Sequence, residues 1–362
     1  MIERLPKFPW DVLFPYRKRA AAHPDGLVNL ALGDPVDPTP PAVRAALAAA
    51  ADAPGYPSTE GTPELRAAVA AWLLRREGAA VEPDAVIPAV GTKELIAWLP
   101  TMLGLGPGDI VLVPELAFPT YEVSARLAGA TLVRTDSPLS HDGPAPRVLW
   151  LNSPSNPEGR VLGTAELRAI VEWARERGTL VVNDECYLDH VWEGETRSVL
   201  HPEVSGGSHR GVLAVHSLSK RFNLAGYRAG FAAGDPEVIA TLLEVRKHAG
   251  HMVPAPVQAA MAAALGDDCH LARQREHYAR RRELLRTALV DAGFRIEHSA
   301  GALFLWATRD EPCWATVGAL ADLGILVAPG EFYGEAGARH VRVAVTETDE
   351  RVEQAVKRLA GG

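Results

Sequence analysis

Short apolar runs recur along the chain between about residues 85 and 235, and each is as long as an ordinary β-strand. The runs cover residues 85–90, 109–114, 130–135, 147–152, 179–184, 211–217 and 229–234. Segments with helical periodicity, such as residues 93–103 and 165–178, separate several of them. Because the runs are apolar on both faces, we predict an α/β fold with a mostly parallel seven-stranded sheet covered by helices on both sides. Ligands of such sheets lie outside the carboxyl ends of the strands.

The pattern changes near residue 256. A long helical stretch, residues 256–293, is expected to bridge two parts of the molecule, and strand-like segments follow it. We predict a large domain of residues 42–255 and a smaller α+β domain of residues 256–362. The proline-rich residues 1–41 are predicted to form an irregular N-terminal arm that packs with the smaller domain and across a subunit interface.

Composition narrows the possible functions. The chain has 362 residues, of which 47% are hydrophobic, so it can form one large and one smaller core. A net charge of -8 indicates neither a nucleic-acid partner nor an anionic membrane surface. Three dispersed cysteines show no metal-binding spacing, and no apolar run reaches the ~18 residues of a membrane span. We therefore predict a cytoplasmic protein with no metal and no membrane partner.

Three strand ends carry groups with distinct chemistry. Gly91, Thr92 and Lys93 follow the first run and open a helix, whose N-terminal N–H groups suit a phosphate. Asp184 ends an apolar strand, where a carboxylate is costly to bury alone. Lys220 follows another strand. Taken singly, the first group is an ordinary helix cap, Asp184 is an acid that caps a loop, and Lys220 is a surface lysine. Together they supply what pyridoxal phosphate requires: an anion site, an acid for the ring nitrogen and an amine for the aldehyde.

The segments "NSPSNPEG", "NDECY" and "SLSKRFNLAGYRAGF", in this order, resemble the class I/II aminotransferases of the fold type I pyridoxal-phosphate enzymes. The resemblance extends from "LALGDP" to "HVRVAVT". It implies that Lys220 binds the cofactor covalently and moves a proton, that Asp184 pairs with the ring nitrogen, and that Arg342 binds the substrate α-carboxylate beside the backbone of Gly33.

The resemblance implies further contacts to the cofactor. Tyr187 and Asn156 are expected at the ring oxygen, Asn156 also beside the substrate, and Phe118 stacked on the ring. The phosphate is expected to contact Gly91, Thr92, Lys93, Ser217 and Arg228. Tyr56 is expected to reach the phosphate of a neighbouring subunit, which implies a homodimer with shared sites. Two positions depart from the family pattern, since Glu158 replaces the usual Thr or Ser and residue 118 is neither Trp nor Tyr.

Longer segments, including "KFPWDVL" and "GILVAPGEFYGEAGARHVRVAVTETDERV", are similar to the actinobacterial N-succinyldiaminopimelate aminotransferases of lysine biosynthesis. This resemblance implies transamination of N-succinyl-LL-2,6-diaminopimelate with 2-oxoglutarate, giving N-succinyl-2-amino-6-oxopimelate and glutamate. A cation is then needed at the distal carboxylates, and the candidates are Arg17, Lys18, Arg160, Arg246 and Lys247.

Other activities remain open. The alternatives are an aminotransferase for aspartate, an aromatic amino acid or another biosynthetic amine, or a carbon–sulfur lyase of the same fold. A binding module such as half of a transcription regulator lacks the DNA-binding domain it would need. A nicotinamide-dependent dehydrogenase is disfavoured because no G-x-G-x-x-G follows the first strand.

Overall fold

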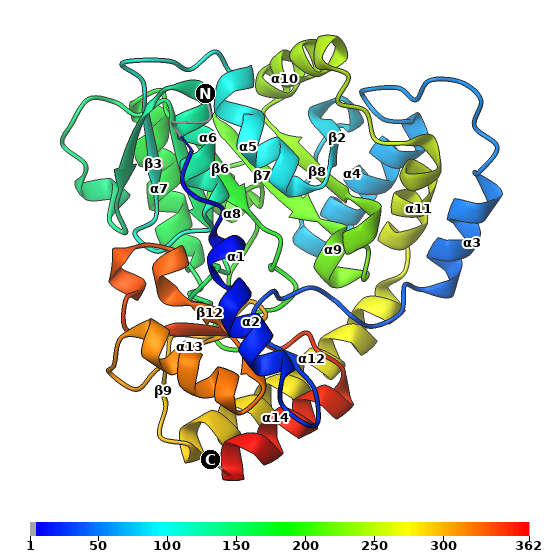
Figure 1. Cartoon of the computed structure of the whole chain (residues 1–362). Coiled ribbons are helices and arrows are strands. Elements are labelled where there is room, and N and C mark those ends of the chain that lie inside the picture. The colour runs from blue at the N-terminus through cyan, green and yellow to red at the C-terminus, as the bar shows by residue number, and fades with distance from the viewer. Residues whose placement is uncertain (1–4, 362) are drawn as a thin grey trace.

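A seven-stranded sheet forms the centre of the molecule (Figure 1). The computed structural model describes residues 5–361, so the first four residues of the predicted arm and Gly362 of the predicted small domain lie outside it. Across the sheet the strands are β2 (Val86–Val90), β8 (Ala229–Gly234), β7 (Val212–Ser217), β6 (Leu180–Asp184), β5 (Val148–Asn152), β3 (Ile110–Val113) and β4 (Thr131–Arg134). Neighbours are parallel except at β8, which is antiparallel to β2 and β7. The predicted mostly parallel sheet is confirmed.

Helices cover both faces of the sheet, which explains why its strands are mostly apolar on both faces. One face packs against α3 (Pro41–Ala49), α4 (Pro63–Glu77), α7 (Thr164–Glu176), α8 (Pro202–Ser205) and α11 (Ala255–Leu265). The other packs against α5 (Thr92–Met102), α6 (Thr120–Ala128) and α10 (Pro236–Ala249). The carboxyl ends of the parallel strands are left accessible at one edge of this three-layer arrangement.

A second, smaller core lies below the sheet in Figure 1. Its four-stranded antiparallel sheet has the order β12 (Ala328–Pro329), β13 (Val341–Ala344), β10 (Phe304–Thr308) and β9 (Arg295–Glu297). Helices α13 (Cys313–Asp322) and α14 (Asp349–Gly361) pack in this core. The parallel pair β1 (Val28–Asn29) and β11 (Ile325–Leu326) joins the N-terminal segment to it.

The N-terminal segment is irregular only in part, which corrects that prediction. It contains α1 (Pro9–Val12) and α2 (Phe14–Ala21) before β1, and α3 follows. In each of these three helices a proline occupies the first turn, where the missing N–H group costs nothing. Arg19 of α2 pairs with Asp322 of α13, which holds the segment against the smaller core.

The long helical stretch is interrupted. Helix α11 ends at Leu265, and α12 (Asp268–Asp291) begins after a turn in which the Asp267 carboxylate accepts a hydrogen bond from His270 N at 3.0 Å. Helix α11 packs in the core of the large sheet, whereas α12 begins in that core and ends in the smaller one. We therefore propose that the boundary between the two parts lies at the α11–α12 turn rather than at residue 255.

A backbone contact joins the two parts near the carboxyl end of β5. Ser299 N donates to Glu158 O at 2.7 Å, and Gly301 N donates to Gly159 O at 2.8 Å. Gly159 has a φ of +69°, and a Cβ atom there would lie 2.4 Å from Gly301 O. Only glycine fits this conformation and this approach.

Gly159→Ala is therefore expected to lower the free energy of unfolding by roughly 1–3 kcal/mol, because alanine is strained in this conformation and displaces the Gly301 backbone. Urea denaturation of the full chain measures it. Gly106→Ala is the matched control, since Gly106 has no positive φ and a Cβ there meets nothing within 4 Å. The control should stay within about 0.5 kcal/mol of the parent. Equal losses in the two variants would contradict the argument.

Candidate active site

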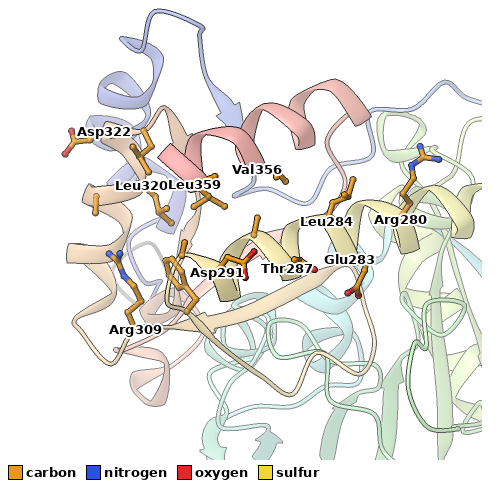
Figure 2. A pocket seen from close by; sticks show the side chains of 16 residues that line it. Arg280, Glu283, Leu284, Thr287, Asp291, Arg309, Leu320, Asp322, Val356 and Leu359 are labelled. Carbon is orange, nitrogen blue, oxygen red and sulfur yellow. The ribbon is translucent and has the colours of Figure 1, made fainter. Parts of the chain in front are cut away.

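The larger of the two main cavities, about 1020 Å³, lies among α12, α13 and α14. Figure 2 shows its apolar side chains, among them Leu284, Val356 and Leu359, with charged groups around them. None of the predicted site residues lines it. The smaller cavity, about 550 Å³, lies at the carboxyl ends of the large sheet's strands. It is lined by the predicted residues Thr92, Lys93, Phe118, Asn156, Asp184, Tyr187, Ser217, Lys220, Arg228 and Arg342. The smaller cavity is therefore the candidate active site.

Lys220 enters the cavity from α9 (Leu218–Arg221), the short helix after β7. The hydroxyl of Ser217 caps this helix by accepting a hydrogen bond from Ser219 N at 3.1 Å. The Lys220 ammonium donates to Gly33 O at 2.5 Å and lies 3.9 Å from Asp34 Oδ1. Burial lowers the pKa of Lys220 to about 8, against the opposing effect of Asp34. A larger fraction of this amine is thus neutral and nucleophilic at physiological pH than for an ordinary lysine.

Asp184 ends β6 as a buried carboxylate in the same cavity. Its Oδ2 accepts a hydrogen bond from the Tyr121 hydroxyl at 2.8 Å, and its Oδ1 accepts one from Cys186 N at 3.2 Å. Burial raises the pKa of Asp184, while these hydrogen bonds lower it. Sequence reasoning missed Tyr121. The available signal was its place three residues after Phe118 at the start of a helix, which puts the two rings on neighbouring positions; they meet edge to face at 5.8 Å.

Positive charge gathers at the start of α5. The helix begins after Gly91, whose φ is +73° and where a Cβ atom would lie 2.2 Å from Arg228 Nη2. Arg228 is fixed by a 2.8 Å hydrogen bond from Nη1 to Ala225 O. Burial lowers the pKa of Lys93, and the charge of Arg228 lowers it further. Free N–H groups of an 11-residue helix beside a guanidinium make a phosphate site.

Arg342 reaches the cavity from β13 in the smaller part of the molecule. Its Nη1 donates to Asn156 Oδ1 at 2.7 Å, and its Nη2 donates to Ala31 O at 2.5 Å. The guanidinium carbon lies 3.9 Å from the Phe304 ring centroid and 5.0 Å from that of Tyr333. Among the described residues, Arg342 Nε is buried and has no hydrogen-bond partner. A buried guanidinium held this way is suited to binding a carboxylate.

Three predicted residues do not line the cavity. One is Gly91, which lies against Arg228 just before α5. Gly33 borders the cavity through its carbonyl group, which accepts from Lys220, and a Cβ atom there would lie 2.6 Å from the Phe304 ring. Tyr56 is 97% exposed on the segment between α3 and α4.

The proposed distal cations also lie outside the lining residues, which corrects that expectation. Arg246 is buried against Glu94, Arg160 pairs with Asp136, and Lys247 pairs with Glu244. Arg17 and Lys18 belong to α2.

An apolar wall completes the cavity, and sequence reasoning missed it. It comprises Leu5, Pro6, Phe8, Pro9, Trp10 and Leu32 of the N-terminal segment, together with Phe118, Phe304, Phe332 and Tyr333. The Lys93 ammonium lies 5.4 Å from the Phe8 ring centroid and 6.0 Å from that of Phe118. The aromatic residues come from distant parts of the chain, so no local sequence motif predicts the apolar wall. Lys7 and Lys93 are the described cations in the lining besides Lys220, Arg228 and Arg342.

Within residues 5–361, no helix is long and apolar enough to cross a bilayer. The same residues contain no group of three or more His, Cys, Asp or Glu side chains placed to hold a metal ion.

Comparison with known proteins assigns the family. The model of the class I and II aminotransferases matches residues 25–359. The 4-dedimethylamino-4-oxo-anhydrotetracycline transaminase of Streptomyces rimosus is 68% identical over 99% of this chain and 100% of its own length. A probable aminotransferase of Mycobacterium tuberculosis is 61% identical over 98% of this chain and 85% of its own length.

A solved structure agrees. The N-succinyldiaminopimelate aminotransferase of Mycobacterium tuberculosis superposes with a TM-score of 0.88 at 28% identity, covering 97% of this chain and 96% of that one. The anion site, the buried lysine and the buried carboxylate fit pyridoxal phosphate, the cofactor of this fold. The chain belongs to the pyridoxal-phosphate-dependent class I and II aminotransferases.

Proposed function

We propose that this aminotransferase moves an amino group between an amino compound and an oxo compound, with glutamate and 2-oxoglutarate as one expected pair, in the candidate active-site cavity. The observation that carries the proposal is the convergence of Lys220, Asp184 and Arg342 on that cavity. A nucleophilic amine, a buried acid and a carboxylate-binding guanidinium are the groups that transamination of an amino acid requires.

When bound, pyridoxal phosphate supplies an aldehyde for the amine and an electron-poor ring that stabilises negative charge on the substrate. Arg228, Ser217 and the start of α5, from Gly91 to Lys93, would hold its phosphate. Asp184 would keep a proton on the ring nitrogen, aided by the hydrogen bonds from Tyr121 and Cys186 N. Phe118 would cover one face of the ring, and Tyr187 and Asn156 would bind its oxygen.

The remaining groups act on the substrate. Arg342 would orient the α-carboxylate, since its contact with Asn156 ties the carboxylate site to the cofactor site. The Lys220 amine, once free of the cofactor, would take the proton from the substrate α carbon and deliver it to the carbon that had carried the aldehyde. Burial favours the neutral amine that this step needs. The apolar wall would exclude water from the reacting atoms.

Lys220→Met should abolish transamination, because no other group in the account binds the aldehyde or moves this proton. Half-reactions with glutamate in single-turnover assays measure it. Near-parental turnover in this variant would refute the role of Lys220.

Comparing the stability of the parent with that of Lys220→Met across pH should also report the pKa of Lys220 in the cofactor-free protein. The folded-state pKa of about 8 lies below the ordinary 10.5, so the unfolded chain holds more protons between these values. Stability of the parent should therefore rise relative to Lys220→Met as pH increases through that window, by on the order of 1–3 kcal/mol. Parallel stability curves for the two proteins would contradict a buried amine.

Arg342→Lys should raise KM for every amino and oxo acid alike, because lysine cannot form the bidentate pair. We expect a loss in kcat/KM equivalent to about 1.5–3 kcal/mol, the usual value of a charged hydrogen bond. Arg339→Lys is the control, since Arg339 is exposed just before β13. A defect confined to one substrate would show that Arg342 contacts a side chain instead.

The first candidate reaction has N-succinyl-LL-2,6-diaminopimelate as the amino donor and 2-oxoglutarate as the acceptor, in lysine biosynthesis. It is supported by the long matching segments and by the similarity to the solved N-succinyldiaminopimelate aminotransferase. The distal carboxylates would then contact Lys93 or Lys7. A fused-ring aromatic ketone is the second candidate. It is favoured by the apolar wall and by the 68% identity to a transaminase of an anhydrotetracycline.

The two candidates predict opposite results in one comparison. If the succinylated compound is the substrate, its kcat/KM should exceed that of aspartate, aromatic amino acids and 4-oxo-anhydrotetracycline by about tenfold or more, equivalent to ~1.4 kcal/mol. Lys7→Met should then weaken the succinylated substrate and spare alanine, whereas Lys93→Met should affect both because Lys93 also belongs to the phosphate site. If the fused-ring ketone is preferred by the same margin, the second candidate replaces the first.

We also propose a cytoplasmic homodimer in which Tyr56 contacts the phosphate of the partner's cofactor, because this exposed ring cannot serve its own cavity. Sedimentation at assay concentrations should show a dimer. Tyr56→Phe should weaken cofactor binding, because the ring hydroxyl is lost while the ring remains. A fully active monomer would refute the proposal.

A further inference from the structure

Four ionisable side chains lie buried behind the active site, and the mechanism above does not use them. Glu185 follows Asp184, His216 precedes Ser217, and Arg221 follows Lys220 in the chain. The fourth, Asp189, lies in the turn after Tyr187. The side chains of all four are at most 2% exposed.

These side chains point away from the cavity because successive strand residues project to opposite faces. Asp184 contacts Tyr121 of α6, on one face of the sheet. Glu185 instead accepts a 3.0 Å hydrogen bond from Asn183, its same-face neighbour. The His216 ring lies 5.3 Å from that of Trp72 of α4, on the opposite face.

Two ion pairs connect the end of β6 to the end of β7. Glu185 Oε2 lies 3.2 Å from His216 Nε2, and Arg221 Nε lies 3.0 Å from Asp189 Oδ2. Arg221 also donates through Nη2 to Glu185 O at 3.4 Å, and its guanidinium lies 4.5 Å from the Trp72 ring centroid. The first pair thus joins the residue after Asp184 to the residue before Ser217. The second pair joins Asp189, two residues after Tyr187, to the residue after Lys220.

Stability does not account for this arrangement. Buried ion pairs cost several kcal/mol of desolvation, and apolar replacements of similar volume are often as stable or more so. Among the described residues, Glu185 Oε2, Asp189 Oδ2, His216 Nε2, and Arg221 Nε and Nη1 make no regular hydrogen bond. Such incompletely bonded charges at a site call for a functional explanation.

We propose that Glu185, Asp189, His216 and Arg221 form a positioning network that fixes the cofactor-binding lysine and carboxylate relative to each other from behind the sheet. The inference rests on the proposed function above. The network acts through the backbone, since α9 is a single turn and Arg221 anchors it directly beside Lys220. The charge of the network also acts on Asp184. Burial raises the pKa of this carboxyl group, and His216 is among the groups that lower it.

The test compares the single variants Arg221→Met and Asp189→Leu with the double variant. Arg221→Met leaves buried Asp189 with only the longer 3.7 Å contact to Arg76, and Asp189→Leu leaves the buried Arg221 guanidinium without its carboxylate. Each single variant should therefore lower the unfolding midpoint of the cofactor-free protein. The double variant should recover most of that midpoint. Its dissociation constant for pyridoxal phosphate, measured by absorbance, should nevertheless be raised about tenfold or more, since small misplacements at a site have effects of this size.

A matched control separates position from stability. Arg281 and Asp37 form a second largely buried pair, with both oxygen contacts at 2.7 Å, and neither residue lines the cavity. Arg281→Met with Asp37→Leu should leave the dissociation constant within about twofold of the parent.

The outcomes decide the proposal. A double variant with restored stability and parental cofactor affinity would overturn it, as would an equal loss of affinity in the control pair. If the double variant does not fold, Asp189→Asn, which preserves shape, is measured in its place, and parental affinity there also overturns the proposal. A parent protein that binds no pyridoxal phosphate would instead refute the proposed function.

Discussion

The site depends on one constraint, which is that a carboxylate and an amine must stay chemically competent while buried at the ends of adjacent parallel strands. Strand register sets their relation, since Asn152 pairs with Asp184 and Asp184 pairs with Val215, two residues before Ser217. Burial alone would protonate the acid and neutralise the amine. For Lys220 this effect of burial is useful, because the neutral amine is the reactive form. For Asp184 the hydrogen bonds from Tyr121 and Cys186 N oppose the effect of burial and favour the carboxylate.

The substrate site adds a second requirement, because its guanidinium comes from the other part of the molecule. Arg342 lies in the small antiparallel sheet and contacts Asn156 at the end of β5. The backbone contacts at Gly159 and Gly301 hold these two parts together close to that point. The distance between the carboxylate site and the cofactor site is therefore set by packing between the two parts and not within either one.

Much of this could be predicted from the sequence. Apolar runs bounded by turns identified every strand of the large sheet, because strands buried on both faces are mostly apolar and their polar residues lie mainly at the ends. The strand-end groups Lys93, Asp184 and Lys220 lie in one cavity, as predicted, because the carboxyl ends of parallel strands meet at one edge of the sheet. Arg228, which the family resemblance predicted, lies there too.

The predictions that were wrong concerned features that depend on tertiary contacts or on the local context of a residue. Prolines at Pro9 and Pro15 suggested irregular chain but begin helices, and Gly266 breaks a stretch that looked continuous. Closeness in sequence to the site motifs suggested Arg246 as a distal cation, yet its side chain is buried and pairs with Glu94. Tyr121 and the aromatic wall depend on distant segments meeting.

The most direct test of the central claim is chemical. The protein loaded with pyridoxal phosphate is reduced with borohydride, digested, and mapped by mass spectrometry. Lys7, Lys93 and Lys220 all line the cavity, so the experiment discriminates among three lysines at the same site. The account predicts the cofactor mass on the peptide containing Lys220 and on no other. Its appearance on Lys93 or Lys7, or on no peptide at all, would contradict the account.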